Sequence, residues 1–230
     1  ALIGARDHAS MHHLRELRAG SSLSVLQLVP DLTFGLSAVR SPAERSTSAS
    51  KTALIVPNTR MRESVSYSGA SQYERTMTSL AEACRAQGFS IAVLNHSGRE
   101  DAALCQQLSH ALGDTPVLQF DDPYEARAAI GRAGVVIASR YHACVAALAQ
   151  GVPCIATAWT HKYRALFAPF QMEYAVLEHG CSEHPERLIA QVIAYHGARE
   201  AERSAVRADL ALQVERMWSE VLQLLGSTAG

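Results

Sequence analysis

An arginine and a histidine stand one residue apart at the end of an apolar run, in the segment VVIASRYHACVAALAQ of residues 135–150. Arg140 can offer a bidentate fork to an oxyanion, and His142 can donate a hydrogen bond or transfer a proton near neutral pH. The apolar run is typical of a strand, and the residues after it are typical of a helix. The first turn of a helix carries unpaired N–H groups and a partial positive charge. The pattern therefore predicts a site for a phosphate or carboxylate, with a proton donor beside it.

A purely structural interpretation of the same residues is also open. Ser139 would cap the helix, Arg140 would pair with a surface carboxylate, and His142 would pack without a chemical role. The sequence GVP at residues 151–153 indicates a turn into the next strand, because glycine permits an unusual backbone angle and proline fixes one. From the spacing alone, both interpretations stand.

Six short apolar runs alternate with helix-like stretches in the main part of the chain. Most of these runs are continuous and do not alternate between apolar and polar residues, which indicates strands that are buried on both faces. The sequence therefore predicts a Rossmann-like α/β domain with a parallel sheet. The six runs are residues 52–57, 90–95, 116–120, 134–139, 152–157 and 173–178.

In such a sheet, ligands bind outside the carboxyl ends of the strands. Arg60 and Arg62 follow the first predicted strand, His96 follows the second, and His161 and Lys162 follow the fifth. The residues that we place at this edge include few carboxylates. We therefore expect the edge to suit a small anion, although each of these side chains also has an ordinary interpretation as a solvated surface group.

The two ends of the chain have a different pattern. Residues 1–36 indicate a short helix around residues 9–19 and a strand-like run over residues 23–34, which together can hardly bury a core. The next stretch is rich in serine, alanine and charge, as in a linker, and the last stretch has the apolar spacing of a long amphipathic helix. We therefore expect four parts, which are residues 1–36, a linker at 37–51, a Rossmann-like domain at 52–197 and a C-terminal helix at 198–230.

Composition excludes several function classes. The chain has 21 basic and 22 acidic residues, so its net charge of -1 does not favour nucleic acid as a partner. No apolar run approaches the roughly 18 residues of a spanning helix. The five cysteines form no C-x-x-C pair, and we expect reduced thiols in a cytoplasmic protein, at most peripheral at the inner face of the membrane. Because the chain begins without methionine and soon enters helix-like sequence, we also expect residues upstream of it.

No metal site is expected. His8, His12 and His13 are close together in sequence, but no carboxylate-and-histidine pattern such as H-E-x-x-H surrounds them. The glycine-rich phosphate loops and the G-x-S-x-G elbow of serine hydrolases are also missing from the sequence. These patterns leave the strand-end residues as the main candidates for chemistry.

The segment SRYHACVAALAQGVPCIATAWTHKY, residues 139–163, is similar to the signature of the polysaccharide pyruvyl transferase family. In that signature a strand is followed by S-R-x-H, a helix, a G-V-P turn, a strand and a lysine. ARDHAS at residues 5–10 and PDLTF at residues 30–34 resemble, more loosely, the segments near the end of the first domain and the crossover to the second. The resemblance covers most of the chain. It implies the C-terminal half of a two-domain, glycosyltransferase-B-like fold, in which residues 1–36 are the tail of the first domain.

The reaction that the resemblance implies moves the three-carbon unit of phosphoenolpyruvate onto two hydroxyls of a sugar in a surface polysaccharide or exopolysaccharide. The products are a cyclic pyruvate ketal and phosphate. Phosphoenolpyruvate is then a donor substrate, no cofactor is needed, and the other partner is a sugar or a lipid-linked oligosaccharide. The C-terminal helix also offers a surface for a homo-oligomer.

The family's donor-binding arginine and histidine correspond to Arg140 and His142. His142 is implied as the catalytic acid, with the alternative that it only holds the phosphate, and Tyr141 between them can contribute its backbone amide. Further candidate phosphoenolpyruvate ligands are Arg60, Arg62 and Lys162, and candidates for facing the cleft are Ser139, His96 and His161.

Two other functions remain open. A glycosyltransferase of the same architecture would bind a nucleotide sugar, usually through a glutamate in the helix after the fourth strand, and YHACVAALAQ at residues 141–150 contains none. A non-catalytic binding module is the second alternative.

Overall fold

The computed structural model describes residues 2–17, 25–36, 51–63, 70–178 and 184–227. Contacts divide the chain into two compact units. The smaller unit contains residues 1–37 and 204–230, and the larger contains residues 38–203. Apart from Lys51, the predicted linker lies outside the described residues, so the boundaries of the linker stay predictions. Cys181 also lies outside the described residues.

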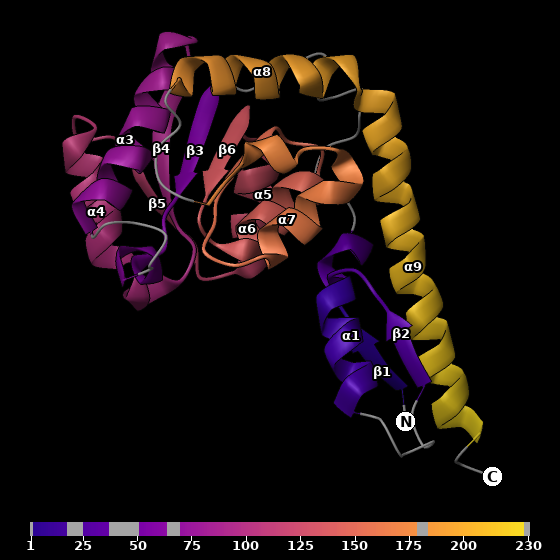
Figure 1. Cartoon of the computed structure of the whole chain (residues 1–230). Coiled ribbons are helices and arrows are strands. Elements are labelled where there is room, and N and C mark those ends of the chain that lie inside the picture. Colours follow the sequence, from indigo (N-terminus) through magenta and orange to yellow (C-terminus); the bar gives the residue numbers. More distant parts are fainter. Residues whose placement is uncertain (1, 18–24, 37–50, 64–69, 179–183, 228–230) are drawn as a thin grey trace. The chain divides into compact units, whose positions relative to one another are not determined.

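The larger unit is built on a six-stranded sheet in the order β5-β4-β3-β6-β7-β8, and every neighbouring pair is parallel (Figure 1). Each predicted apolar run contains one of these strands, which confirms the parallel-sheet α/β fold. The central strands β3, β6 and β7 are almost entirely buried, which explains their continuous apolar sequence. The strands are β3 (Thr52–Val56), β4 (Ser90–Asn95), β5 (Val117–Gln119), β6 (Val135–Ala138), β7 (Cys154–Thr157) and β8 (Val176–Leu177).

Helices connect the strands and cover the sheet. The chain runs outward from β3 to β5 and then returns to β6 beside β3, so right-handed crossovers place α3 and α4 on one face and α5 and α6 on the other. Contacts between α3 and α8 and between α5 and α6 agree with these two layers (Figure 1). The helices are α3 (Ala70–Ala86), α4 (Ala102–Ala111), α5 (Pro123–Arg132), α6 (Tyr141–Ala149), α7 (Lys162–Phe167) and α8 (Pro185–Ala198), with 3₁₀ turns η2 (Thr59–Glu63), η3 (Gly98–Glu100), η4 (Ala168–Phe170) and η5 (Glu173–Ala175).

The turn between α6 and β7 has the predicted geometry. Gly151 has φ +68°, a left-handed conformation that favours glycine. The N–H of Val152 donates to the carbonyl of Ala147 and the N–H of Gly151 donates to that of Leu148, which closes the end of the helix. The GVP sequence therefore ends one element and aligns the next strand in the sheet.

The smaller unit contains a two-stranded parallel sheet, the helix α1 (His8–Leu17) and most of α9 (Glu200–Ser227). Its strands are β1 (Leu2–Ala5) and β2 (Val25–Leu28), followed by the 3₁₀ turn η1 (Leu32–Gly35). We did not predict β1 from sequence, because four residues with a glycine among them give too weak a strand pattern. The 28-residue α9 confirms the predicted long C-terminal helix.

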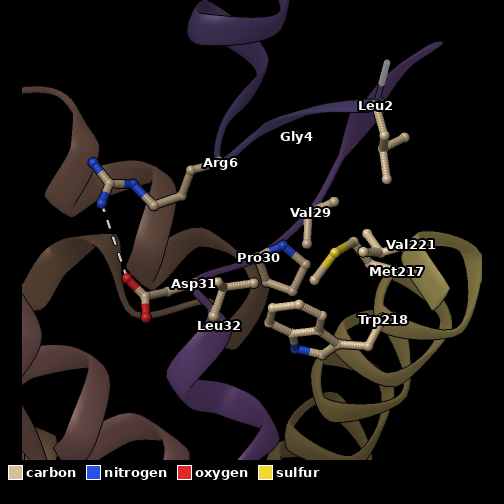
Figure 2. A pocket seen from close by; sticks show the side chains of 10 residues that line it. All are labelled: Leu2, Gly4, Arg6, Val29, Pro30, Asp31, Leu32, Met217, Trp218 and Val221. Carbon is tan, nitrogen blue, oxygen red and sulfur yellow. Dashed lines mark ion pairs between the residues drawn. The ribbon is translucent and has the colours of Figure 1, made fainter. Parts of the chain in front are cut away.

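An open cavity of about 420 Å³ lies in the smaller unit (Figure 2). Apolar side chains from β1, from the segment that follows β2 and from α9 line most of it, and Arg6 and Asp31 form an ion pair of 3.9 Å at one side. The lining residues are Leu2, Gly4, Arg6, Val29, Pro30, Asp31, Leu32, Met217, Trp218 and Val221.

The helix α9 is buried along part of its length only. Val214 and Met217 are buried, whereas Leu222 and Leu225 are more than half exposed. Oligomerisation through this helix stays a prediction. No helix in the described part of the chain is long and apolar enough to cross a bilayer, and the expected location of the protein stays a prediction as well.

Candidate functional site

A buried polar network joins the carboxyl ends of β3, β6 and β7. The hydroxyl of Ser139 lies 2.6 Å from that of Tyr73 and 2.5 Å from that of Thr157. The carbonyl of Ser139 accepts hydrogen bonds from the Tyr163 hydroxyl at 2.7 Å and from the Asn58 side chain at 3.3 Å. The network therefore fixes the backbone immediately before Arg140, where three strands end.

Ser139 does not line an open cleft, contrary to our expectation. Its side chain is fully buried and its hydroxyl is used within the network. Nor does it cap α6, because Arg140 occupies the N-cap position and accepts from the N–H groups of Ala143 and Cys144 through its carbonyl. A serine at a strand end looks polar in sequence, but the Tyr73 that satisfies it comes from α3, 66 residues away in sequence.

We expect Tyr73→Phe to destabilise the protein by about 1–3 kcal/mol. The Tyr73 hydroxyl accepts from the backbone N–H of Asn58 at 3.0 Å and also contacts Ser139, so its loss leaves buried polar groups unsatisfied. Urea unfolding of the variant measures the loss. Tyr124→Phe is the matched control, because Tyr124 is 65% exposed and its loss of a hydroxyl should be nearly neutral. Equal stability of the two variants would contradict the role given to the network.

The guanidinium of Arg140 is held by two carboxylates. Its Nε and Nη2 each donate to Asp101 at 2.7 Å, and Nη2 also donates to Glu100 at 3.1 Å. The Asp101 side chain is fully buried, and the Arg140 side chain is 17% exposed. Burial lowers the pKa of Arg140, but the hydrogen bonds and charges of the two carboxylates outweigh burial and raise it. The Nη1 group takes no part in these hydrogen bonds and can donate to another oxyanion.

Our expectation that this edge has few carboxylates is therefore wrong. Asp101 stands at the N-cap of α4, where sequence alone suggests a capping role, but its side chain makes no cap hydrogen bond. It faces Arg140 instead and accepts from the backbone N–H of Thr59 at 2.9 Å. The Thr59 hydroxyl also donates to the carbonyl of Glu100. These bonds tie the loops after β3 and β4 to the start of α6.

His96 and His142 lie in the same electrostatic environment. His96 is half-buried at the end of β4, and His142 is exposed in the first turn of α6. Burial lowers the pKa of His96, and the positive charges of His142 and Arg140 lower it further, while Asp101 opposes them. The four side chains therefore influence one another across the edge, with His96 biased toward its neutral form.

The lowered pKa of His96 predicts a loss of stability in acid. Below about pH 6.5 the unfolded chain binds a proton that His96 in the folded chain does not bind. The free energy of unfolding should therefore fall as the pH falls from about 6.5 toward the folded-state pKa. Urea unfolding at about pH 7.5 and pH 5.5 tests this, and His96→Asn should reduce the difference between the two pH values. His13→Asn, at an exposed position on α1, is the control that should leave it unchanged.

Lys162 lies among aromatic rings at the end of β7. Its Nζ is 5.1 Å from the centroid of the Tyr141 ring, 5.5 Å from that of Trp159 and 5.6 Å from that of Tyr163, distances typical of cation–π contacts. The Tyr141 ring in turn meets the His142 ring edge-on, with centroids 5.7 Å apart. A continuous set of contacts therefore leads from Trp159 to His142.

The remaining candidates differ in their surroundings. Arg62 pairs with Glu74 at 2.9 Å, whereas Arg60 is exposed and no ion pair joins it to any residue that the structure describes. His161 is exposed at the N-cap of α7. Arg60 directly follows Thr59, whose backbone N–H donates to Asp101, so the backbone of Arg60 lies close to the ion pair between Asp101 and Arg140. Of the two arginines, Arg60 is therefore better placed to meet a ligand there.

We call Arg140, Tyr141, His142, His96 and Lys162 the strand-end site. It offers an arginine donor edge, a lysine ammonium, the start of a helix and two imidazoles, of which that of His96 is the more buried. This combination can bind a small phosphorylated or carboxylated compound and can transfer a proton to it. No group of three or more metal-ligating side chains occurs in the described ranges of the chain.

The architecture is shared with several solved structures. The UDP-GlcNAc 2-epimerase from Neisseria meningitidis has a TM-score of 0.53 at 14% identity, over 95% of this chain and 60% of that one. The α,α-trehalose 6-phosphate synthase from Burkholderia multivorans has a TM-score of 0.54 at 11% identity, over 99% and 59%. WaaG, a glycosyltransferase involved in lipopolysaccharide biosynthesis, has a TM-score of 0.52 at 14% identity, over 93% and 60%.

At these identities the comparisons establish the fold alone, which is a parallel-sheet α/β fold with a long C-terminal helix and with GT-B glycosyltransferases among its neighbours. The chain spans about three fifths of the length of these structures. No curated protein matches it. The sequence model of the polysaccharide pyruvyl transferases, however, matches residues 1–161, so the chain belongs to the polysaccharide pyruvyl transferase family.

Proposed function

We propose that the protein transfers a pyruvyl group from phosphoenolpyruvate to two hydroxyls of a polysaccharide sugar and forms a cyclic ketal. The observation that carries the proposal is the family match, which includes the S-R-Y-H segment at the junction of β6 and α6. The physical character of the strand-end site supports it. Phosphoenolpyruvate carries a phosphate and a carboxylate on a three-carbon frame, and the site gathers donors that suit both groups.

Arg140 is the main ligand of the donor in this proposal. Asp101 and Glu100 hold its Nε and Nη2, so the guanidinium is oriented before the substrate arrives, and Nη1 is directed to a substrate oxygen. The backbone amide of Tyr141 and the ammonium of Lys162 complete the anion site. Arg60, which no carboxylate among the described residues engages, adds a further positive charge.

His142 is the proton donor in the proposed reaction. It protonates the methylene carbon of phosphoenolpyruvate, which becomes a methyl group, and the central carbon then accepts the first sugar hydroxyl. The proton of that hydroxyl returns to His142. The bond between the central carbon and the phosphate oxygen then breaks, the second hydroxyl attacks, and its proton leaves with the phosphate. One proton thus goes to the methyl group and one to phosphate, which balances the two hydroxyls consumed.

His142 suits this step because of its position. It is exposed in the first turn of α6, beside Arg140, where an incoming donor would lie. Its ring packs against the buried ring of Tyr141, which restricts its orientation. The neighbouring His96 has a lowered pKa, so at neutral pH it favours the neutral form and is the weaker candidate for the acid.

A glycosyltransferase that uses a nucleotide sugar is the second candidate, favoured by the fold of the structural neighbours. The helix α6 contains no acidic residue, so it offers no carboxylate to hold the ribose of a nucleotide sugar. A non-catalytic module that only binds the anion is the third. Each of the three predicts a different product or none.

Product analysis tests the proposal. The protein is incubated with phosphoenolpyruvate and a panel of oligosaccharides in deuterium oxide, and the products are followed by ¹H and ³¹P NMR. We expect inorganic phosphate and a new ketal methyl signal in equal amounts, with one deuterium in each methyl group. Phosphate release with free pyruvate and no ketal, or transfer only from a nucleotide sugar, would contradict the proposal.

A further inference from the structure

Trp159 is an exposed aromatic side chain beside the strand-end site, and it has no part in the proposed reaction. It follows β7 by two residues, and 38% of its surface is exposed. Thr157, at the end of the same strand, touches Ser139, which directly precedes Arg140. The indole and the proposed donor ligand therefore leave the sheet from adjacent strands at the same edge.

The indole lies between a tyrosine of the core and a lysine. Burial raises the pKa of Tyr163 and the nearby Trp159 indole lowers it, so the two side chains are neighbours. The Tyr163 ring is fully buried, and its hydroxyl donates to the carbonyl of Ser139 at 2.7 Å. Lys162 lies over the indole at 5.5 Å from the ring centroid. A substantial part of the Trp159 ring nevertheless stays in contact with solvent.

We propose that Trp159 is the stacking platform for a pyranose ring of the acceptor. The apolar C–H face of a sugar packs on an indole, while the hydroxyls project from the rim of the ring. Ketal formation needs two hydroxyls of one sugar to reach the same carbon, so a platform that holds the ring by its face leaves those hydroxyls accessible. The inference rests on the proposed function, because it assumes that a sugar is the acceptor.

The contacts around Lys162 support this assignment. Lys162 lies over both the Trp159 and Tyr141 rings, and Tyr141 packs edge-on against His142. Three successive side-chain contacts therefore separate the platform from the proposed acid. That spacing suits an acceptor whose reacting ring is stacked on the indole or is the next sugar along the chain.

Tryptophan fluorescence provides a direct test, because the protein contains only two tryptophans, Trp159 and Trp218. Trp218→Phe leaves Trp159 as the single tryptophan, and Trp159→Phe leaves Trp218, which is exposed on α9 in the smaller unit. The methyl glycosides of glucose, galactose, mannose and N-acetylglucosamine are the probes. We expect at least one of them to change the emission of Trp159 saturably and to leave the emission of Trp218 unchanged.

Affinities distinguish a platform from a merely structural tryptophan. Trp159→Ala should weaken binding of the responding glycoside by on the order of 10-fold, and Trp159→Tyr should restore part of it. Phosphoenolpyruvate affinity, measured by calorimetry, should stay within about twofold of the parent in both variants, since the indole faces the acceptor.

Several results would overturn the inference. These are an unchanged Trp159 emission with all four glycosides, an equal response of Trp218, a response to uridine diphosphate in place of the glycosides, or an equal loss of phosphoenolpyruvate affinity in Trp159→Ala. The fluorescence test uses the Trp159 side chain unaltered, so it stands even if the alanine variant fails to fold. Absence of phosphoenolpyruvate binding in the parent would instead refute the proposed function.

Discussion

His142→Gln is expected to lower the turnover of ketal formation by at least about 100-fold, within the range of about 10²- to 10⁴-fold that a positioned general acid contributes. Carbon is protonated slowly, so the reaction depends on an acid held against the methylene group. Glutamine keeps a hydrogen-bond donor but cannot deliver this proton. The affinity for phosphoenolpyruvate should therefore be largely retained while turnover at saturation falls, which steady-state kinetics and calorimetry measure separately.

His161→Gln is the matched control for this prediction. His161 is also an exposed histidine at the same edge of the sheet, at the start of α7, and the proposed reaction gives it no proton to transfer. Its variant should keep near-parental turnover. If His142→Gln turned over at the same rate as the parent, His142 would have no part in the chemistry. If it lost binding but kept its saturated rate, His142 would be a ligand of the phosphate.

Arg140→Ala is expected to weaken phosphoenolpyruvate binding by about 2–5 kcal/mol, the usual cost of removing one partner of a desolvated charge pair. The guanidinium is oriented by Asp101 and Glu100, so no other side chain can replace its geometry. Calorimetric titration of the variant measures the loss. Arg140→Lys should recover only part of the affinity, because an ammonium cannot keep the two-nitrogen contact with Asp101 while it donates to the substrate.

A second variant separates binding from local misfolding. Arg140→Ala alone leaves the buried Asp101 carboxylate without its main partner, which can disturb the loop after β4. In the double variant with Asp101→Asn, the unpaired charge is gone, and the asparagine oxygen can still accept from the Thr59 N–H. Affinity should stay low in the double variant. Recovery of phosphoenolpyruvate binding would show that Arg140 acts on Asp101 and does not bind the donor.

The fold was largely predictable because buried parallel strands have continuous apolar sequences. The runs at residues 52–57 and 134–139 contain β3 and β6, and the apolar spacing of the last stretch indicated α9. In contrast, β1 could not be predicted from the sequence. Backbone hydrogen bonds hold β1 beside β2, and a strand of four residues is too short to have a recognisable side-chain pattern.

The candidate site was predictable only in part. The position of Arg140 and His142 after a strand and before a helix followed from local sequence, and the structure places both residues there. The Asp101 partner of Arg140 did not follow, because it is 39 residues away in sequence and stands where an aspartate normally caps a helix. The aromatic surroundings of Lys162 were also missed, since they depend on how α6 and α7 meet at the sheet edge.

Calorimetric titration of the unmodified protein measures whether this chain binds phosphoenolpyruvate as a donor substrate. Phosphoenolpyruvate and a nucleotide sugar such as UDP-glucose are titrated separately, and each titration is repeated with Arg140→Ala. Phosphoenolpyruvate is expected to bind saturably at one site per chain and to lose most of this binding in the variant, whereas the nucleotide sugar is expected not to bind saturably. Saturable binding of the nucleotide sugar, together with no heat of binding from phosphoenolpyruvate, would rule out phosphoenolpyruvate as the donor.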